Sequence, residues 1–159
     1  MTKINNFNNL EIRKALDRDS SKIIEFNQAM AMETENKRLG TDTLSKGVEH
    51  LMSHPELGFY LVAEDTLTKS IVGSLMITYE WSDWRASLFL WIQSVYVVPT
   101  HRRRGVYKKL YEFVKSYQPE SEVGTVCGIR LYVDVHNKNA QKVYGKLQMN
   151  HSHYLMYES

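Results

Sequence analysis

Residues 93–107 decide the fold expected for this chain, and they read QSVYVVPTHRRRGVY. The stretch ends an apolar strand, turns through three consecutive arginines at 102–104 and enters a helix. The N-terminus of a helix leaves its first amides unpaired and carries a partial positive charge, so it binds phosphate groups readily. Gly105 allows the backbone to approach a ligand closely. The turn therefore predicts an anion site where the strand meets the helix.

A run of basic residues at a helix start more often keeps the helix solvated than binds a ligand. The context of this run favours a ligand, because it directly follows a strand that is apolar on both faces, and open α/β sheets bind ligands at such junctions. The turn is neither a P-loop, since no Gly-Lys-Ser/Thr follows, nor a dinucleotide-binding fingerprint, since the glycine spacing is absent.

Apolar periodicity predicts the other elements. Strands are expected at residues 10–16, 58–64, 70–80, 85–98, 128–135 and 151–157, and helices from about residue 20 and over 43–53, 104–117 and 139–147. Along the long strand, one expected face holds Phe89, Trp91, Val95 and Val97, and the other holds Leu88, Leu90, Ile92, Tyr96 and Val98. This order predicts a single-domain α/β fold with a mixed, mostly antiparallel central sheet flanked by helices, preceded by a flexible lead at residues 1–9.

Composition narrows the class of protein. The chain has 159 residues, of which 43% are apolar and 24% charged, as in a soluble globular domain. A net charge of +2 gives no field that would favour nucleic acid or a membrane as partner. We expect a cytoplasmic protein, because the sequence shows neither a signal-peptide core nor an apolar run of about 20 residues. The single Cys127 excludes an internal disulfide and a cysteine-rich zinc site, and no metal is expected.

Two segments resemble a known family. Residues 93–107 resemble the central motif of the GNAT acyl-CoA-dependent N-acyltransferases, in which a strand, a proline and an Arg/Gln-x-x-Gly-x-Gly/Ala turn lead into a helix. Arg102 and Gly105 match this motif, whereas Tyr107 stands where the family usually has Gly or Ala. Residues 131–149 resemble the second motif, a strand followed by an Asn-x-x-Ala-x-x-x-Tyr helix. The resemblance implies an N-acetyltransferase that moves an acetyl group from acetyl-CoA to a primary amine of a small molecule or peptide.

The resemblance also implies where acetyl-CoA binds. Its pantetheine arm would lie along the strand at residues 95–97, and backbone amides of residues 103–108 would hold the pyrophosphate. The residues expected to contact acetyl-CoA are Val95, Tyr96, Val97, Arg102, Arg103, Arg104, Gly105, Val106, Tyr107, Lys108 and Asn137. Asn137 is equally well explained as a helix cap. A homodimer is common in the family, and the apolar terminal strand is compatible with one.

Catalysis requires an acid for the leaving thiolate and assistance for the attacking amine. Tyr144 matches the catalytic tyrosine of the family, although its spacing also suits a core residue of an amphipathic helix. Gln93 stands where many members carry Glu, and its amide can orient a water but cannot accept a proton. The base stays open among Glu33, Glu35, Glu80, Asp83, Asp134, His136, His151 and His153. Glu80 is preferred because it lies beside the tryptophans in sequence.

All three tryptophans, at positions 81, 84 and 91, fall in one short stretch. The turn at residues 81–84 has two interpretations. It either caps the core or makes a dimer contact, or it lines an acceptor pocket in which an aromatic wall and a carboxylate attract a cationic amine. The residues expected on the acceptor side are Trp81, Asp83, Trp84 and Glu33.

Two other functions stay open at this point. One is a CoA-binding module without catalysis, which Gln93 and Tyr107 suggest because both depart from the family pattern. The other is a nucleic-acid-binding α/β domain that uses residues 102–109 as a phosphate contact. The small net charge and the confinement of the basic run to one helix start argue against nucleic acid.

Overall fold

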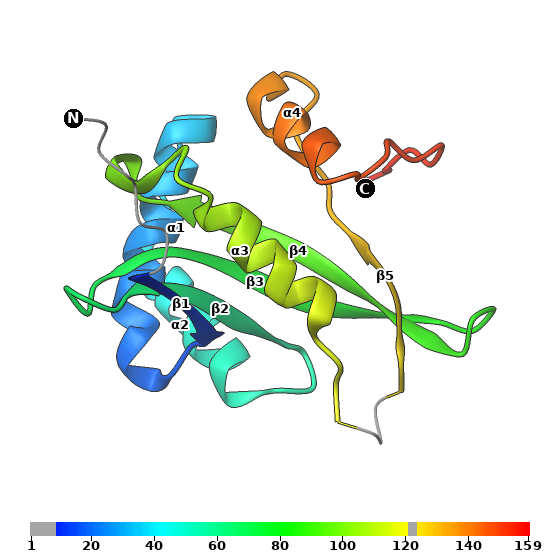
Figure 1. Ribbon diagram of the computed structural model, residues 1–159, viewed down its shortest axis with the longest axis horizontal. Coiled ribbons are helices and arrows are strands. Elements are labelled where there is room, and N and C mark those ends of the chain that lie inside the picture. The colour runs from blue at the N-terminus through cyan, green and yellow to red at the C-terminus, as the bar shows by residue number, and fades with distance from the viewer. Residues whose placement is uncertain (1–8, 121–123) are drawn as a thin grey trace.

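Five strands form one sheet in the computed structural model, which describes residues 9–120 and 124–159 (Figure 1). Their order across the sheet is β1 (Leu10–Lys14), β2 (Gly58–Asp65), β3 (Ile71–Ser82), β4 (Ser87–Val97) and β5 (Val126–Arg130). Strands β1 to β4 are antiparallel, whereas β5 runs parallel to β4 after a helical crossover. The predicted mixed, mostly antiparallel α/β sheet is therefore confirmed.

Helices cover both faces of this sheet (Figure 1). Helices α1 (Ser20–Glu35) and α2 (Thr41–Ser53) cover one face and α3 (Val106–Ser116) covers the other, whereas α4 (Lys138–Lys146) follows after the chain has left the sheet. The short 3-10 turns are η2 (Asp17–Asp19) and η3 (Pro99–His101). Side chains of β2 alternate between two cores: Leu61 and Ala63 pack with α3, whereas Tyr60 and Val62 pack with α1 and α2. Because successive side chains of a strand point to opposite faces, the sheet lies between two helical layers. Among the described residues, none of the helices is long and apolar enough to cross a bilayer.

A bulge in β4 changes which side chains share a face. The strand has one extra residue between Gln93 and Tyr96, and Ser94 adopts a left-handed φ of 50° there. The alternation predicted for residues 85–98 is wrong beyond this point. Val95 and Val97 pack in the core beneath α3, and Tyr96 faces α1. An extra residue reverses the faces of everything that follows it, because side chains alternate with a period of two.

The C-terminal strands differ from the prediction. The strand expected at 128–135 starts earlier and ends at Arg130, and the strand expected at 151–157 is not formed. Side chains from Tyr154 to Tyr157 are 58–88% exposed. A strand requires a hydrogen-bonding partner as well as a suitable sequence, and no described strand runs beside residues 151–157. The flexible lead predicted at 1–9 lies outside the described residues except for Asn9.

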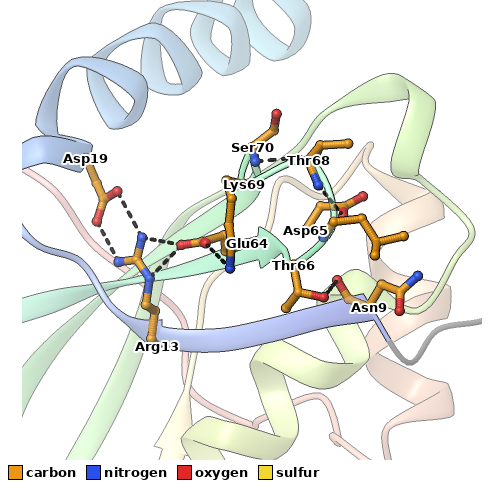
Figure 2. A network of polar contacts seen from close by, with 10 residues as sticks. Asn9, Arg13, Asp19, Glu64, Asp65, Thr66, Thr68, Lys69 and Ser70 are labelled. Carbon is orange, nitrogen blue, oxygen red and sulfur yellow. Dashed lines mark hydrogen bonds and ion pairs between the residues drawn. The ribbon is translucent and has the colours of Figure 1, made fainter.

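A buried ion network joins β1, η2 and β2 (Figure 2). The guanidinium of Arg13 donates to both carboxylate oxygens of Asp19, at 2.7 and 3.1 Å, and to Glu64 at 2.7 and 3.0 Å. Asp19 also accepts a hydrogen bond from the backbone amide of Leu16, at 2.8 Å. Both carboxylates are buried. The network fixes the start of α1 against the edge of the sheet.

Candidate active site

Strand β4 has a free edge next to the site. Strand β5 pairs with β4 only from Leu88 to Trp91, and after Arg130 the chain leaves the sheet (Figure 1). From residue 92 to residue 97, therefore, no described strand lies beside β4 on that side. A free strand edge offers backbone donors and acceptors to an extended ligand. The predicted pantetheine contacts at Val95, Tyr96 and Val97 lie along this edge.

The basic turn continues directly from this edge. Arg103 and Gly105 both have left-handed backbones, with φ of 60° and 77°. Helix α3 follows, and the amide of Lys109 donates to the carbonyl of Gly105 at 3.0 Å. The amides of residues 106–108 consequently have no partner inside the helix, as at every helix start. The turn and the helix start present backbone amides of the kind that suits an anion, and the predicted pyrophosphate contact stays a prediction.

Arg102 points away from this helix start and is already paired. Its Nη2 lies 2.7 Å from Oε2 of Glu33, and its Nε donates to the carbonyl of Val97 at 2.8 Å. The hydroxyl of Tyr96 donates to the other oxygen of Glu33 at 3.1 Å. Burial, and then this bond to Glu33, raises the pKa of Tyr96. The structure thus pairs an expected cofactor residue with an expected acceptor residue, and it ties the end of α1 to the turn.

Glu80 on β3 is held by two donors, one from β4 and one from β5. Nε1 of Trp91 donates to one carboxylate oxygen at 2.5 Å, and Nη1 of Arg130 donates to the other at 2.5 Å. The guanidinium of Arg130 also lies 3.6 Å from the ring centre of Phe89. Both carboxylate oxygens therefore have a charge-assisted hydrogen bond, which fixes the direction of the side chain. This geometry suits an orienting role better than proton abstraction.

Gln93 lies two residues further along β4, on the same face as Trp91. Its Nε2 donates to the hydroxyl of Thr78 on β3 at 2.6 Å, so the side chain has a fixed direction. Sequence reasoning singled out neither Thr78 nor Arg130. Both reach the site through cross-strand register, which local patterns do not encode. The only local signal was a charged residue, Arg130, inside an otherwise apolar run.

Tyr144 lies on α4 against the start of α3. Its ring meets the ring of Tyr107 edge to face, with centroids 5.7 Å apart. Burial raises the pKa of Tyr144, which keeps its hydroxyl protonated near neutral pH. The bulky Tyr107 is accommodated because its ring packs between the helices and stacks with Tyr111 at 6.3 Å. The backbone amide of Tyr107 therefore stays at the helix start without its side chain blocking it.

Asn137 caps α4. Its Oδ1 accepts the amide of Ala140 at 3.1 Å, as an N-cap side chain does. We expect Asn137→Ala to lower the free energy of unfolding by about 1 kcal/mol, because one helix-start amide loses its acceptor. Urea denaturation measures this change. Asn137→Asp keeps the cap and serves as the control; equal destabilisation by Asp and Ala would contradict a capping role.

The tryptophan turn lies far from the basic turn. Strand β3 extends through Ser82, so the turn falls at residues 83–86, and Trp81 and Trp84 are 57% and 89% exposed. Asp83 accepts the amide of Trp84 at 2.9 Å. The length of β4 separates this hairpin tip from the basic turn by about 33 Å at 3.3 Å per residue. The structure does not bring Trp81, Asp83 or Trp84 to the basic turn, and their acceptor role stays a prediction.

The model of the Acetyltransferase (GNAT) family matches residues 22–149, which include β4, the basic turn, α3 and α4. The chain belongs to the GNAT acetyltransferase family. A possible acetyltransferase from Clostridium difficile 630 is 42% identical, with a TM-score of 0.84 over 94% of this chain and 96% of that chain. No match is found among curated proteins.

More distant GNAT structures share the fold. A ribosomal-protein-alanine N-acetyltransferase from Brucella melitensis biovar Abortus 2308 has a TM-score of 0.72 at 16% identity, covering 94% of this chain and 97% of that one. A predicted acetyltransferase from Clostridium acetobutylicum, solved with acetyl-CoA, has the same score and identity over 94% and 96%. At this identity the likeness concerns the fold alone. Within the described residues, no group of three or more His, Cys, Asp or Glu could hold a metal ion.

Proposed function

We propose that this GNAT protein transfers the acetyl group of acetyl-CoA to a primary amine of a small molecule or peptide by direct attack. One observation carries the proposal: the free edge of β4 leads into a left-handed turn and the unpaired amides of α3. An extended, neutral pantetheine arm suits the strand edge, and a pyrophosphate suits the helix start. Both features follow each other along one continuous backbone.

Acetyl-CoA supplies an activated acyl carbon and a thiolate leaving group. The amine nitrogen forms a bond to that carbon, the C–S bond breaks, and its electron pair goes to sulfur. Tyr144 gives its phenolic proton to the sulfur and is later reprotonated from water. The attacking nitrogen loses its proton to solvent, through waters oriented by Gln93 and Glu80, whose side chains are fixed by Thr78, Trp91 and Arg130.

A binding assay and a thiol-release assay test this proposal. CoA should raise the melting temperature strongly, because it binds only the folded chain, whereas an oligonucleotide should not. Acetyl-CoA should then release free thiol with at least one member of a panel of polyamines, amino acids, aminoglycosides and N-terminal peptides. Tight CoA binding without thiol release would instead support a CoA-binding module. Stabilisation by the oligonucleotide alone would support a nucleic-acid-binding domain.

Gly105 tests the pyrophosphate position. Gly105→Ala places a side chain on a backbone with φ of 77°, which we expect to cost about 1 kcal/mol of stability and to raise KM for acetyl-CoA. The matched control is Gly47→Ala in α2, where an added Cβ meets no atom within 4 Å. That variant should gain about 0.5–1 kcal/mol, because alanine favours helix, and keep its KM. An unchanged KM in Gly105→Ala would contradict the placement.

We also propose that the protein is a homodimer. The support is the exposed apolar segment at residues 154–157, which lies outside the sheet. Light scattering after gel filtration should give the mass of two chains. Leu155→Asp should yield a monomer, and Trp84→Ser should not; the reverse result would move the contact to the tryptophan turn, and a wild-type monomer would exclude the dimer.

A further inference from the structure

The hydroxyl of Tyr107 is buried without a hydrogen-bond partner among residues 9–120 and 124–159. An unpaired buried hydroxyl destabilises a folded protein, and phenylalanine would fill the same space without that cost. The ring itself is well packed, with Tyr111 stacked on one side and Tyr144 meeting it edge to face. Packing therefore accounts for an aromatic ring at position 107 but not for its oxygen.

The proposed reaction creates a charge on Tyr144, whose ring contacts the ring of Tyr107. A phenol has a pKa of about 10 and a thiol about 8.5, so proton transfer from tyrosine to a thiolate is unfavourable by a factor of about 30. Burial raises the pKa of Tyr144 and increases that factor. Any group that stabilises the ionised Tyr144 makes this proton transfer easier.

We propose that Tyr107 is a positioning residue for acetyl transfer: its O–H donates a hydrogen bond to the phenolate oxygen of Tyr144 when that oxygen becomes charged. The proposal rests on the function proposed above. The two rings are in contact between α3 and α4, with centroids 5.7 Å apart and planes at 64°. A hydrogen bond to a charged oxygen is stronger than one between neutral groups. The hydroxyl without a partner in the resting protein thus gains one at the step that needs it.

The directions of the pKa shifts in this tyrosine cluster agree with these roles. Burial raises the pKa of Tyr107, and the negative charges of Tyr144 and then Tyr111 raise it further. For Tyr144 and for Tyr111, burial is the cause of the raised pKa. A negative charge on Tyr144 therefore favours the protonated form of Tyr107. A protonated phenol is the donor that a neighbouring phenolate requires.

The first test measures ionisation of Tyr144 without any substrate. In the full chain labelled with ¹³Cζ-tyrosine, the Tyr144 resonance is identified by its loss in Tyr144→Phe. We expect Tyr107→Phe to raise the midpoint of its titration by about one pH unit, which corresponds to a tenfold effect of a charged hydrogen bond. Tyr111→Phe, one helical turn away, is the matched control and should leave the midpoint unchanged. An unchanged midpoint in Tyr107→Phe overturns the proposal.

The second test asks whether Tyr107 acts through Tyr144. We expect Tyr107→Phe to lower kcat about tenfold with an unchanged KM for acetyl-CoA, and to have no further effect in a Tyr144→Phe background. Equal losses in both backgrounds would show a merely structural role and overturn the proposal. Tyr107→Phe should unfold at the same temperature as wild type or higher, because the unpaired hydroxyl is gone. If wild type acetylates no amine, the proposed function fails, while the titration still decides the role of Tyr107.

Discussion

Replacing Tyr144 with phenylalanine is expected to lower kcat for acetyl transfer by about 10²–10⁴-fold, the usual contribution of a positioned acid. The phenolic proton is the one that the leaving thiolate takes, and phenylalanine has none. The ring of Tyr144 packs against Tyr107, so the variant keeps its shape and its fold. KM for acetyl-CoA should stay near the wild-type value, because the lost interaction forms only in the transition state.

Thiol release measured over a range of acetyl-CoA concentrations gives kcat and KM separately. Tyr111→Phe is the control, since Tyr111 is a buried tyrosine of the same cluster with no role in proton transfer. It should retain its turnover. If Tyr144→Phe turns over at the wild-type rate, Tyr144 is a packing residue of α4, and the proton donor lies elsewhere.

Replacing Arg13 with methionine is expected to lower the free energy of unfolding by about 3 kcal/mol, because two buried carboxylates lose their shared partner. This change in the free energy of unfolding lies at the lower end of the range for buried ion pairs, because the Arg13 side chain is 17% exposed. For a domain of this size the melting temperature should fall by about 6–12 °C. Lys22→Met is the control, because Lys22 forms an exposed pair with Glu25 and should change stability by at most about 0.5 kcal/mol.

The network also fixes how stability depends on pH. Burial opposes the ionisation of Asp19, but hydrogen bonds from Arg13 and the Leu16 amide outweigh it and hold the pKa below its usual value. Hydrogen bonds from Arg13 lower the pKa of Glu64 in the same way. A lowered pKa stabilises the fold above the unfolded values of about 3.9 and 4.3, and this stabilisation is lost as pH falls through the lower folded values.

Urea denaturation from pH 7 to pH 3 measures that dependence. Wild type should lose stability below about pH 5, where the unfolded chain begins to bind more protons than the folded one. In Arg13→Met the two carboxylates lose the hydrogen bonds that lower their pKa values most, so the difference between the two proteins should shrink with acid. A constant difference across this range would show that Arg13 acts through packing alone.

Most helices and strands could be predicted from local patterns. The helices at 20–35 and 41–53 and the hairpin strands follow from apolar spacing, and the crossover from β4 to β5 follows from a strand, an amphipathic helix and another strand in sequence. The two predictions that were wrong, for the end of β4 and for residues 151–157, have the same cause. The bulge at Ser94 and the unpaired segment at 151–157 depend on what lies beside the chain, which alternation does not record.

The candidate site likewise has one part that local sequence predicts and one part that it does not. Its backbone part could be predicted, because a strand end, a glycine and a helix start are consecutive in sequence. Its side-chain part could not. Glu33 meets Arg102 across 69 residues and Glu80 meets Arg130 across 50, and no local pattern indicates either pair. The expected acceptor group at residues 81–84 instead lies at the far tip of the hairpin.

By itself, then, the sequence determined the α/β class, the strand–turn–helix backbone at residues 93–107 and the tyrosine on α4, because each depends on residues within one or two turns of each other. Only the tertiary structure decided which strand edge stays free, which carboxylates are already paired, and that Tyr107 lies against Tyr144 with a hydroxyl that has no partner within the described part of the chain. These features arise from strand register and helix packing. Register and packing are set by the whole core, so distant residues fix them together.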